Sequence, residues 1–174
     1  GVPDTWFEDD GNGGNALMID LGTLGGSGSV AFDINDLGQV VGRSWRADGT
    51  GYHAFIIVPE DVDGDGVPDT WFRDETGPDE EPDGANDLMI SLGTMGNAGG
   101  SDSTATGISN SGYVVGVLGG PNPVGGGAFI IVPEVDDNEV PDTWFSPDAQ
   151  GGNALMIIVT TGAISQANGV NDSG

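Results

Sequence analysis

The sequence predicts an all-β protein made of tandem antiparallel four-stranded units, which are blade-like repeats joined by calcium-binding loops. Three observations lead to this fold class. The 174 residues include 33 Gly and 10 Pro, a turn-forming content that disfavours long helices. The apolar residues come in short runs between Gly, Asn, Asp or Pro, as in strands separated by turns. The same segments also recur along the chain, which is typical of one supersecondary unit used several times.

Four sequence landmarks define the repeat. They divide the chain into a first unit (1–66), a second unit (67–139) and a partial third unit (140–174). Because the chain starts and stops inside landmarks, we expect the natural polypeptide to continue with more repeats or to complete its last unit with a neighbouring molecule. The landmarks are Val-Pro-Asp-Thr-Trp-Phe at Val2, Val67 and Val140, Leu-Met-Ile at Leu17, Leu88 and Leu155, Ala-Phe-Ile-Ile-Val-Pro-Glu at Ala54 and Ala128, and a turn leading into Val-Val-Gly at Asn35 and Ser109, which begins again at Asn171.

Each element of the first unit has its own strand signal. Residues 16–24 contain the mostly apolar run Leu-Met-Ile-Asp-Leu, and residues 29–35 alternate between larger apolar and other side chains. The turn Asn-Asp-Leu-Gly then connects 29–35 to 39–45, which predicts a hairpin. Residues 52–58 form a continuous apolar run that ends at Pro59, as expected for a strand covered on both faces. The second unit repeats this scheme over 88–95, 103–109, 112–118 and 127–132.

An acidic stretch after the fourth strand predicts a calcium site. Its Asp residues stand at alternate positions with glycines between and after them, so a tightly wound backbone could turn three carboxylates toward one hard cation. The spacing matches positions 1, 3, 5, 7 and 9 of an EF-hand loop, but Phe72 stands where that loop has its closing Glu. A solvated acidic turn is the alternative, since Asp and Gly also build ordinary turns. The predicted ligands are Asp61, Asp63, Asp65 and Asp69, with the Val67 carbonyl.

A second acidic stretch precedes the third Val-Pro-Asp. Counting back from that landmark aligns four oxygen-bearing side chains with the ligands of the first loop. Gly66, however, is replaced by Glu139, which disfavours the same backbone path. The predicted ligands of this second calcium site are Glu134, Asp136, Asn138 and Asp142.

Two resemblances follow from these motifs. The acidic loop is similar to the calcium-binding type 3 repeats of thrombospondin, which lack flanking EF-hand helices. The segments Leu-Gly-Thr-Leu-Gly-Gly (21–26), Ala-Phe-Asp-Ile-Asn-Asp-Leu-Gly-Gln-Val-Val-Gly (31–42) and His-Ala-Phe (53–55) resemble the bacterial extracellular HAF repeats. This second resemblance covers most of both complete units and implies an extracellular, multi-copy β repeat without enzymatic activity. The acidic loop is an addition to the HAF pattern, and Gly127 replaces the histidine in the second copy.

Charge and composition exclude several classes of partner. The formal charge is −25, with no Lys and three Arg, so we expect neither nucleic-acid binding nor insertion into a membrane. Divalent cations would relieve the repulsion among the acidic groups. The chain has no Cys and therefore no disulfides, which leaves bound metal as the way to staple a secreted protein of this kind.

The aromatic and titratable residues offer few functional candidates. Trp6, Trp71 and Trp144 each precede a Phe, and we interpret them as structural plugs that anchor the acidic loops, with a sugar-stacking platform as the alternative. Trp45 has no counterpart in the second unit, so it is the candidate binding residue, together with the two arginines beside it. His53 is the single histidine and lies inside an apolar strand, so we expect it to be structural and the protein not to be an enzyme.

The sequence therefore predicts an extracellular or cell-surface protein with a structural or adhesive role, stabilised by calcium. Exposed sheet edges would let copies associate through β edges or terminal strand exchange and form a filament or surface array. The alternative from another class is a fragment of a carbohydrate-binding β-propeller. A glycoside hydrolase is a remote third possibility, because a catalytic carboxylate pair cannot be recognised from sequence spacing.

Overall fold

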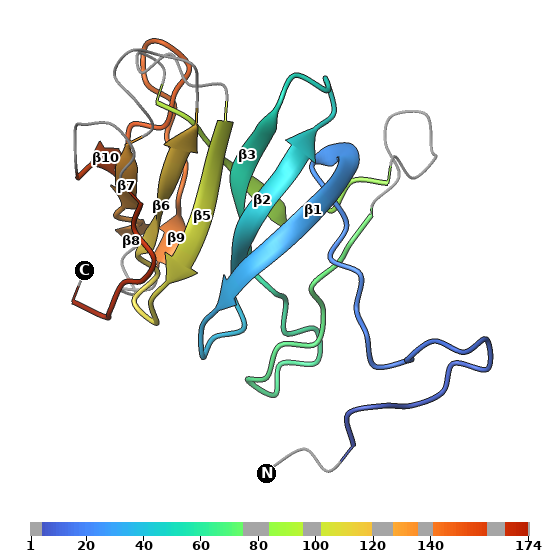
Figure 1. The fold of residues 1–174 in the computed structure, drawn as a ribbon. Coiled ribbons are helices and arrows are strands. Elements are labelled where there is room, and N and C mark those ends of the chain that lie inside the picture. Colours follow the sequence, from blue (N-terminus) through green and yellow to red (C-terminus); the bar gives the residue numbers. More distant parts are fainter. Residues whose placement is uncertain are drawn as a thin grey trace.

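In the computed structural model the chain forms two antiparallel four-stranded sheets that lie side by side (Figure 1). The structure describes residues 5–74, 84–95, 102–119, 127–135, 141–159 and 166–173. No helix occurs among these residues, so the predicted all-β class is confirmed. Within the same ranges there is accordingly no helix with the length and apolar character needed to cross a membrane.

The first sheet has the strand order β1-β2-β3-β4. A hairpin joins β1 and β2 as predicted, and Asn35 closes its turn by accepting the N–H groups of Leu37 and Gln39 with its side-chain oxygen. Gly38 in this turn has a φ of 75°, a conformation that favours glycine. The strands are β1 (Gly25–Ile34), β2 (Val40–Arg46), β3 (Tyr52–Ile57) and β4 (Met89–Gly93).

The second sheet repeats the first with the order β5-β6-β7-β10. The ladders are equivalent, because Ala31 pairs with Gly42 in the first sheet as Ala105 pairs with Gly116 in the second, and a bulge follows each pair. Both glycines have an aromatic ring packed where a Cβ would stand. The strands are β5 (Asp102–Ile108), β6 (Val114–Gly119), β7 (Ala128–Ile131) and β10 (Met156–Ile158).

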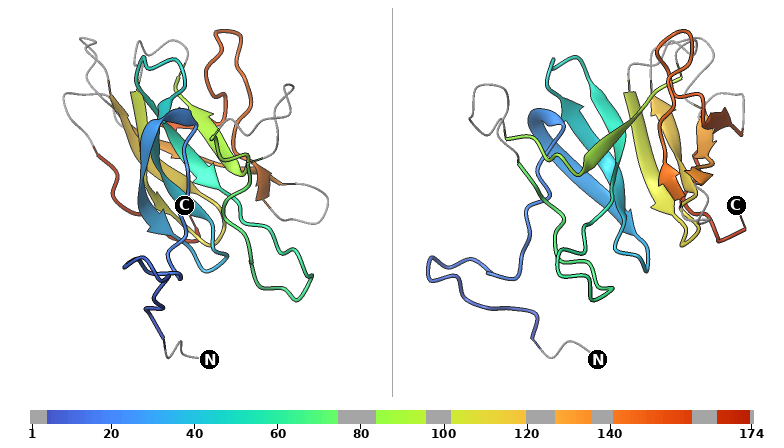
Figure 2. Two further views of the ribbon diagram at one scale, coloured as in Figure 1. Left: turned by 90° about the vertical axis from the view of Figure 1, so that its right-hand side faces the viewer. Right: turned by 180° about the vertical axis from the view of Figure 1, so that it is seen from behind.

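The predicted strand 16–24 is wrong for this chain. Residues 16–22 form no strand, although Leu21 packs on the first sheet, and within the predicted range only Thr23 and Leu24 make isolated bridges (Figures 1 and 2). The Leu-Met-Ile segment of the second copy supplies β4, which pairs with β3 of the first unit. The closing strand of each sheet thus comes from the following sequence repeat, so the first sheet crosses the predicted boundary at 66/67. Within the part of the chain that the structure describes, no β3-type strand pairs with residues 16–22.

The two sheets share one hydrophobic core. Strand β5 contacts β1, β2 and β3, so one face of the first sheet packs against one face of the second. The opposite face of the first sheet has a smaller core of its own, made of Val40, Phe55, Ile57, Leu88 and Met89. The shared core contains Val41, Ala54, Ile56 and Leu92 of the first sheet, with Ala105, Ile108, Val114, Leu118, Phe129, Ile131, Trp144 and Met156 of the second unit.

Two tryptophans anchor the segments that follow the acidic loops. The indole Nε1 of Trp71 donates to the Gly38 carbonyl at 2.7 Å, and that of Trp144 donates to the Gly112 carbonyl at 2.8 Å. Both acceptors lie in hairpin turns of the sheets. The structural role predicted for these two residues is therefore confirmed, and each acidic loop is tied to the tip of its own sheet.

Candidate metal site

The first acidic loop is a hairpin that starts just after β3. Its base is closed by backbone hydrogen bonds between Glu60 and Thr70, with the Glu60 N–H donating at 3.0 Å and the Thr70 N–H at 3.2 Å. The Arg73 guanidinium lies 2.5 Å from the Glu60 carboxylate and adds an ion pair at this base. Together with the Trp71 anchor, these contacts hold both ends of the loop.

Inside the loop, the Asp side chains fold the backbone around themselves. The two carboxylate oxygens of Asp61 accept the N–H groups of Gly64 at 2.7 Å and Gly66 at 2.8 Å. Both glycines have positive φ, 76° and 88°, so the path of the loop depends on glycine at these points. Asp63 accepts the N–H of Asp65 in the same manner. The alternation of Asp and Gly thus produces a wound loop with its carboxylates directed inward.

This winding gathers three of the predicted ligands. Asp61, Asp63 and Asp65 each place one carboxylate oxygen within 4.8 Å of the others, and all three residues are exposed. Three ionised carboxylates at this spacing repel one another, and a hard divalent cation prefers such oxygen ligands. The group could therefore hold a metal ion and would gain electrostatic stability from one.

The other two predicted ligands of this loop have different positions. Asp69 lies outside the group, and its Oδ2 accepts the N–H of Val62 at 3.0 Å and of Asp63 at 3.4 Å. It therefore closes the loop across its base. Val67 is exposed, and its N–H donates to Asp65 at 2.8 Å.

The second acidic loop is aligned differently from the prediction. Glu134 in β8 (Glu134–Val135) pairs with Thr143 in β9 (Pro141–Thr143), as Glu60 pairs with Thr70. Glu134 is thus equivalent to Glu60 and not to Asp61, because the loop is one residue shorter. Asp142 is an exposed residue of β9. Asp136 and Asn138 lie outside the described residues, so this second metal site stays a prediction.

The predicted binding residue Trp45 lies at the end of β2 and is 45% exposed. Its ring meets Tyr52 edge-on at 5.8 Å, and the Arg43 guanidinium lies 4.7 Å from the centre of the Tyr52 ring. The hairpin register that opposes Trp45 and Tyr52 could have identified the second ring from the sequence. A shallow hollow here is lined by Ser27, Gly28, Ser29, Val30, Arg43, Trp45 and Tyr52.

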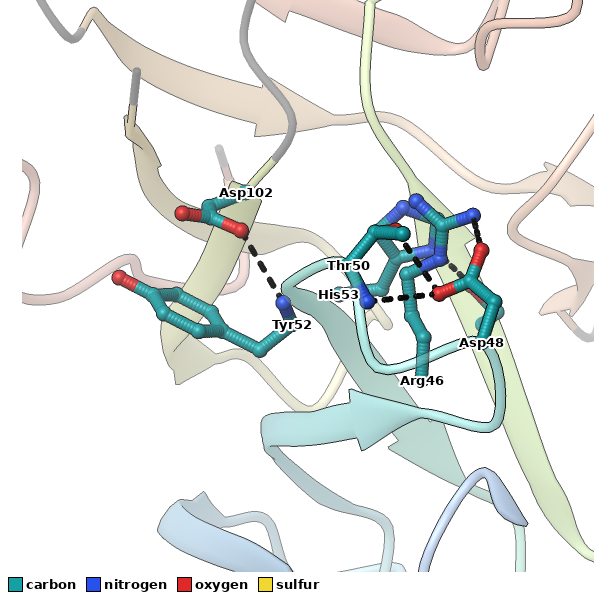
Figure 3. Close-up of polar contacts among 7 residues, drawn as sticks. Arg46, Asp48, Thr50, Tyr52, His53 and Asp102 are labelled. Carbon is teal, nitrogen blue, oxygen red and sulfur yellow. Dashed lines mark hydrogen bonds and ion pairs between the residues drawn. The ribbon is translucent and has the colours of Figure 1, made fainter. Parts of the chain in front are cut away.

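The turn beside this hollow is held by polar contacts (Figure 3). Asp48 accepts the Thr50 N–H at 3.0 Å and hydroxyl at 2.8 Å and pairs with Arg46, and these bonds, the backbone one first, lower the pKa of Asp48. The Tyr52 N–H donates to Asp102 of β5 at 3.0 Å. This bond joins the two sheets next to the hollow.

His53 has a structural environment. Its Nδ1 lies 2.9 Å from the Ser91 hydroxyl on the neighbouring strand. Burial, with a smaller effect from Arg46, lowers the pKa of His53, so the neutral ring is favoured. A neutral histidine bonded across a sheet agrees with the predicted structural role.

Comparisons with protein-family models, with curated proteins and with solved structures give no significant match to this chain. The resemblance to the HAF repeats accordingly stays a prediction.

Proposed function

We propose that this chain is part of an extracellular structural or adhesive protein, in which calcium-stabilised β units follow one another end to end. The observation that carries this proposal is a contact repeated between successive units. The Asp36 N–H of the first unit donates to Asn110 of the second at 2.9 Å, and the Asn110 N–H donates to Asp172 of the third at 2.7 Å. Asp36, Asn110 and Asp172 occupy the same position of the repeat. The same contact thus joins the first unit to the second and the second to the third, which supports an array that grows by stacking.

Calcium is the metal we assign to the acidic loop. The ligands are carboxylates on a solvent-exposed loop, which suits calcium better than the smaller magnesium ion with its strict octahedral demand. The loop is tied to the sheet through Trp71, so an ion bound there would restrain the connection between β3 and the strand that closes the sheet. A bound calcium ion would therefore have a structural role.

The partners and location follow from the same features. A formal charge of −25 disfavours nucleic acid and anionic membranes, and the absence of Cys leaves metal as the available staple. We assign no enzymatic activity. Self-association through β edges or strand exchange would build the filament or surface array.

A melting experiment tests the calcium assignment. At a calcium concentration one hundred times the dissociation constant the stabilisation is about 2.7 kcal/mol, which raises Tm by roughly 5–10 °C for a domain of this size. We expect EDTA to remove this gain, magnesium not to restore it, and Asp63→Ala to abolish the response to calcium.

Asp10→Ala is the matched control. Asp10 closes a turn by accepting the N–H groups of Asn12 and Gly14, much as Asp61 does, but it does not belong to the three-carboxylate group. Its substitution should leave the calcium response intact. A Tm that is the same in calcium and EDTA for the unmutated chain would overturn the assignment.

Carbohydrate binding is the second candidate function, favoured by the Trp45 hollow. Exposed aromatic rings bind sugar faces, and Arg43 and Ser27 of this hollow offer hydrogen-bond donors. A glycan array with the unmutated chain and Trp45→Ala tests it. Binding that Trp45→Ala removes would support this function, and the absence of binding to any glycan would reject it.

A further inference from the structure

One face of the first sheet is uncovered where its equivalent in the second sheet is buried. Ile34 of β1 is 58% exposed, whereas its equivalent Ile108 in β5 is 6% exposed. Ala31 is exposed as well, and its equivalent Ala105 is fully buried. The difference arises because the first sheet covers the second, while nothing in the described residues covers the first in the same way. An apolar groove marks this face and is lined by Ile19, Leu21, Ala31, Phe32, Asp33, Ile34, Val40 and Trp71.

The Ser29 hydroxyl on this face makes one of the two hydrogen bonds that its equivalent, Ser103, makes in the second sheet. In the second sheet, the Ser103 hydroxyl donates to the Gly93 carbonyl and accepts the N–H of Ala54 from the covering sheet at 2.8 Å. In the first sheet, the equivalent Ser29 hydroxyl donates to the Gly22 carbonyl at 2.6 Å. A covering strand would supply the second bond, as β3 does for Ser103.

Residues 21–24, which lead to this face, are positioned like their equivalents in the second unit. Leu21 packs on the small core of the first sheet, as its equivalent Leu92 packs in the shared core. The Asn86 side chain donates to the Leu21 carbonyl at 2.8 Å, and Asn153 donates to the Leu92 carbonyl at 3.1 Å. Residues 21–24 thus hold the position that residues 92–95 hold on the second sheet.

The residues before Leu21 have the sequence of a closing strand but no sheet. Met18 is 77% exposed, whereas its equivalents Met89 and Met156 in β4 and β10 are 5% and 2% exposed. Trp6 is also 77% exposed, whereas its equivalent Trp144 is 2% exposed. The uncovered face of the first sheet and the unpaired residues 17–21 therefore lie next to each other. One additional sheet could cover this face and pair with these residues.

We propose that a further unit of this repeat docks here, takes residues 17–21 as its closing strand and covers the Ile34 face. This inference rests on the proposed array of units. It identifies the Ile34 face as the surface where the array continues and another repeat unit as the partner that binds there. By equivalence with the existing junction, the partner presents short aliphatic residues where the first sheet has Val41, Ala54 and Ile56.

The partner also carries Asn at the tip of its first hairpin. The residues at this position are Asp36, Asn110 and Asp172 in succession, so each junction joins a carboxylate to an amide. A unit preceding Asp36 continues this alternation with Asn, because two carboxylates facing each other would repel. The second unit of this chain has both features and is the partner of choice for a test.

A prefixed chain provides the test. Residues 102–138 are added directly before Gly1, which joins β5-, β6- and β7-type strands to the acidic loop in the spacing of the repeat. The added strands should pair with residues 17–21, so Trp6 fluorescence shifts to shorter wavelength. The amide of Ile19 or Asp20, whichever faces the added strand, should become protected from hydrogen exchange. Trp6 is followed in a background with the other three Trp residues replaced by Phe, and exchange in the unsubstituted chain confirms the result independently.

Two substitutions then locate the docking surface. Ile34→Asp should leave Tm unchanged in the original chain, where Ile34 is exposed, and lower it by several degrees in the prefixed chain. Val30→Asp, on an exposed residue of the same strand directed toward the other face, should act equally in both chains. The proposal is overturned if neither Ile19 nor Asp20 gains protection after prefixing, or if Ile34→Asp acts equally in both chains. It is also overturned if sedimentation shows that the original chain already dimerises through Ile34, because the occupant is then a second copy. None of these outcomes depends on calcium, which is tested separately above.

Discussion

The segment from the Trp-Phe pair to Leu-Met-Ile occurs three times, and its copies have different surroundings. In each copy an Asn side chain donates to the Trp carbonyl and accepts the N–H of the following Leu, so the local turn is the same. Only the second and third copies add a strand to a sheet. Local sequence therefore determines this turn, whereas the strand and the burial of Trp require a neighbouring sheet. The three Asn–Trp pairs are Asn15 with Trp6, Asn86 with Trp71 and Asn153 with Trp144.

The largest effect should come from removing the three tryptophans one at a time. Trp144→Ala deletes a buried side chain from the shared core and should lower the free energy of unfolding by about 3–5 kcal/mol. Trp71→Ala should cost less, because Trp71 is only partly buried, and Trp6→Ala should cost nothing measurable. Urea denaturation at fixed calcium measures the series. Equal losses for all three variants would show that the copies do not differ in packing.

Replacing the equivalent asparagines with Ala should lower the free energy of unfolding by smaller amounts, in the same order as for the tryptophans. Asn153→Ala leaves buried backbone groups without their partners and should cost about 1–3 kcal/mol. Asn15→Ala should cost much less, because water replaces the lost bonds at an exposed turn. A loss at Asn15 as large as that at Asn153 would mean that the turn, and not the sheet, provides the stability of this module.

The sequence predicted the strands well and their partners less well. β2 and β3 lie within one residue of the predicted ranges 39–45 and 52–58, because turns and apolar runs are local signals. The origin of the fourth strand depends on which repeat lies beside β3, and no local pattern carries that information. The loop shows the same division. Asp and Gly spacing predicted the group of three carboxylates, but counting back from Val-Pro-Asp misaligned the second loop by one residue. The Ala-Phe-Ile-Ile-Val-Pro-Glu landmark already aligns Glu134 with Glu60, as the strand pairing does.

The smallest effect concerns His53, which has Gly127 at the equivalent position. Burial lowers the pKa of His53 in the folded state, so below the unfolded value of about 6.5 the unfolded chain binds more protons. The free energy of unfolding should therefore decrease as the pH falls from about 7.5 to about 5.5, where free carboxylates stay ionised. His53→Gln should reduce this slope. A slope that the substitution leaves unchanged would place the titrating group elsewhere.

Successive units are joined by a packed core and not merely by a linker. Amide hydrogen exchange of the unmutated chain tests this directly. Ala54 and Ile108 donate their N–H groups across the junction, to Ser103 and Asp33. We expect these two amides to exchange at the same rate as the central strands β2 and β6, because both sheets open together, while the amides of Ile19 and Asp20 exchange freely. Rapid exchange of Ala54 and Ile108, with separate opening of the two sheets, would contradict the account.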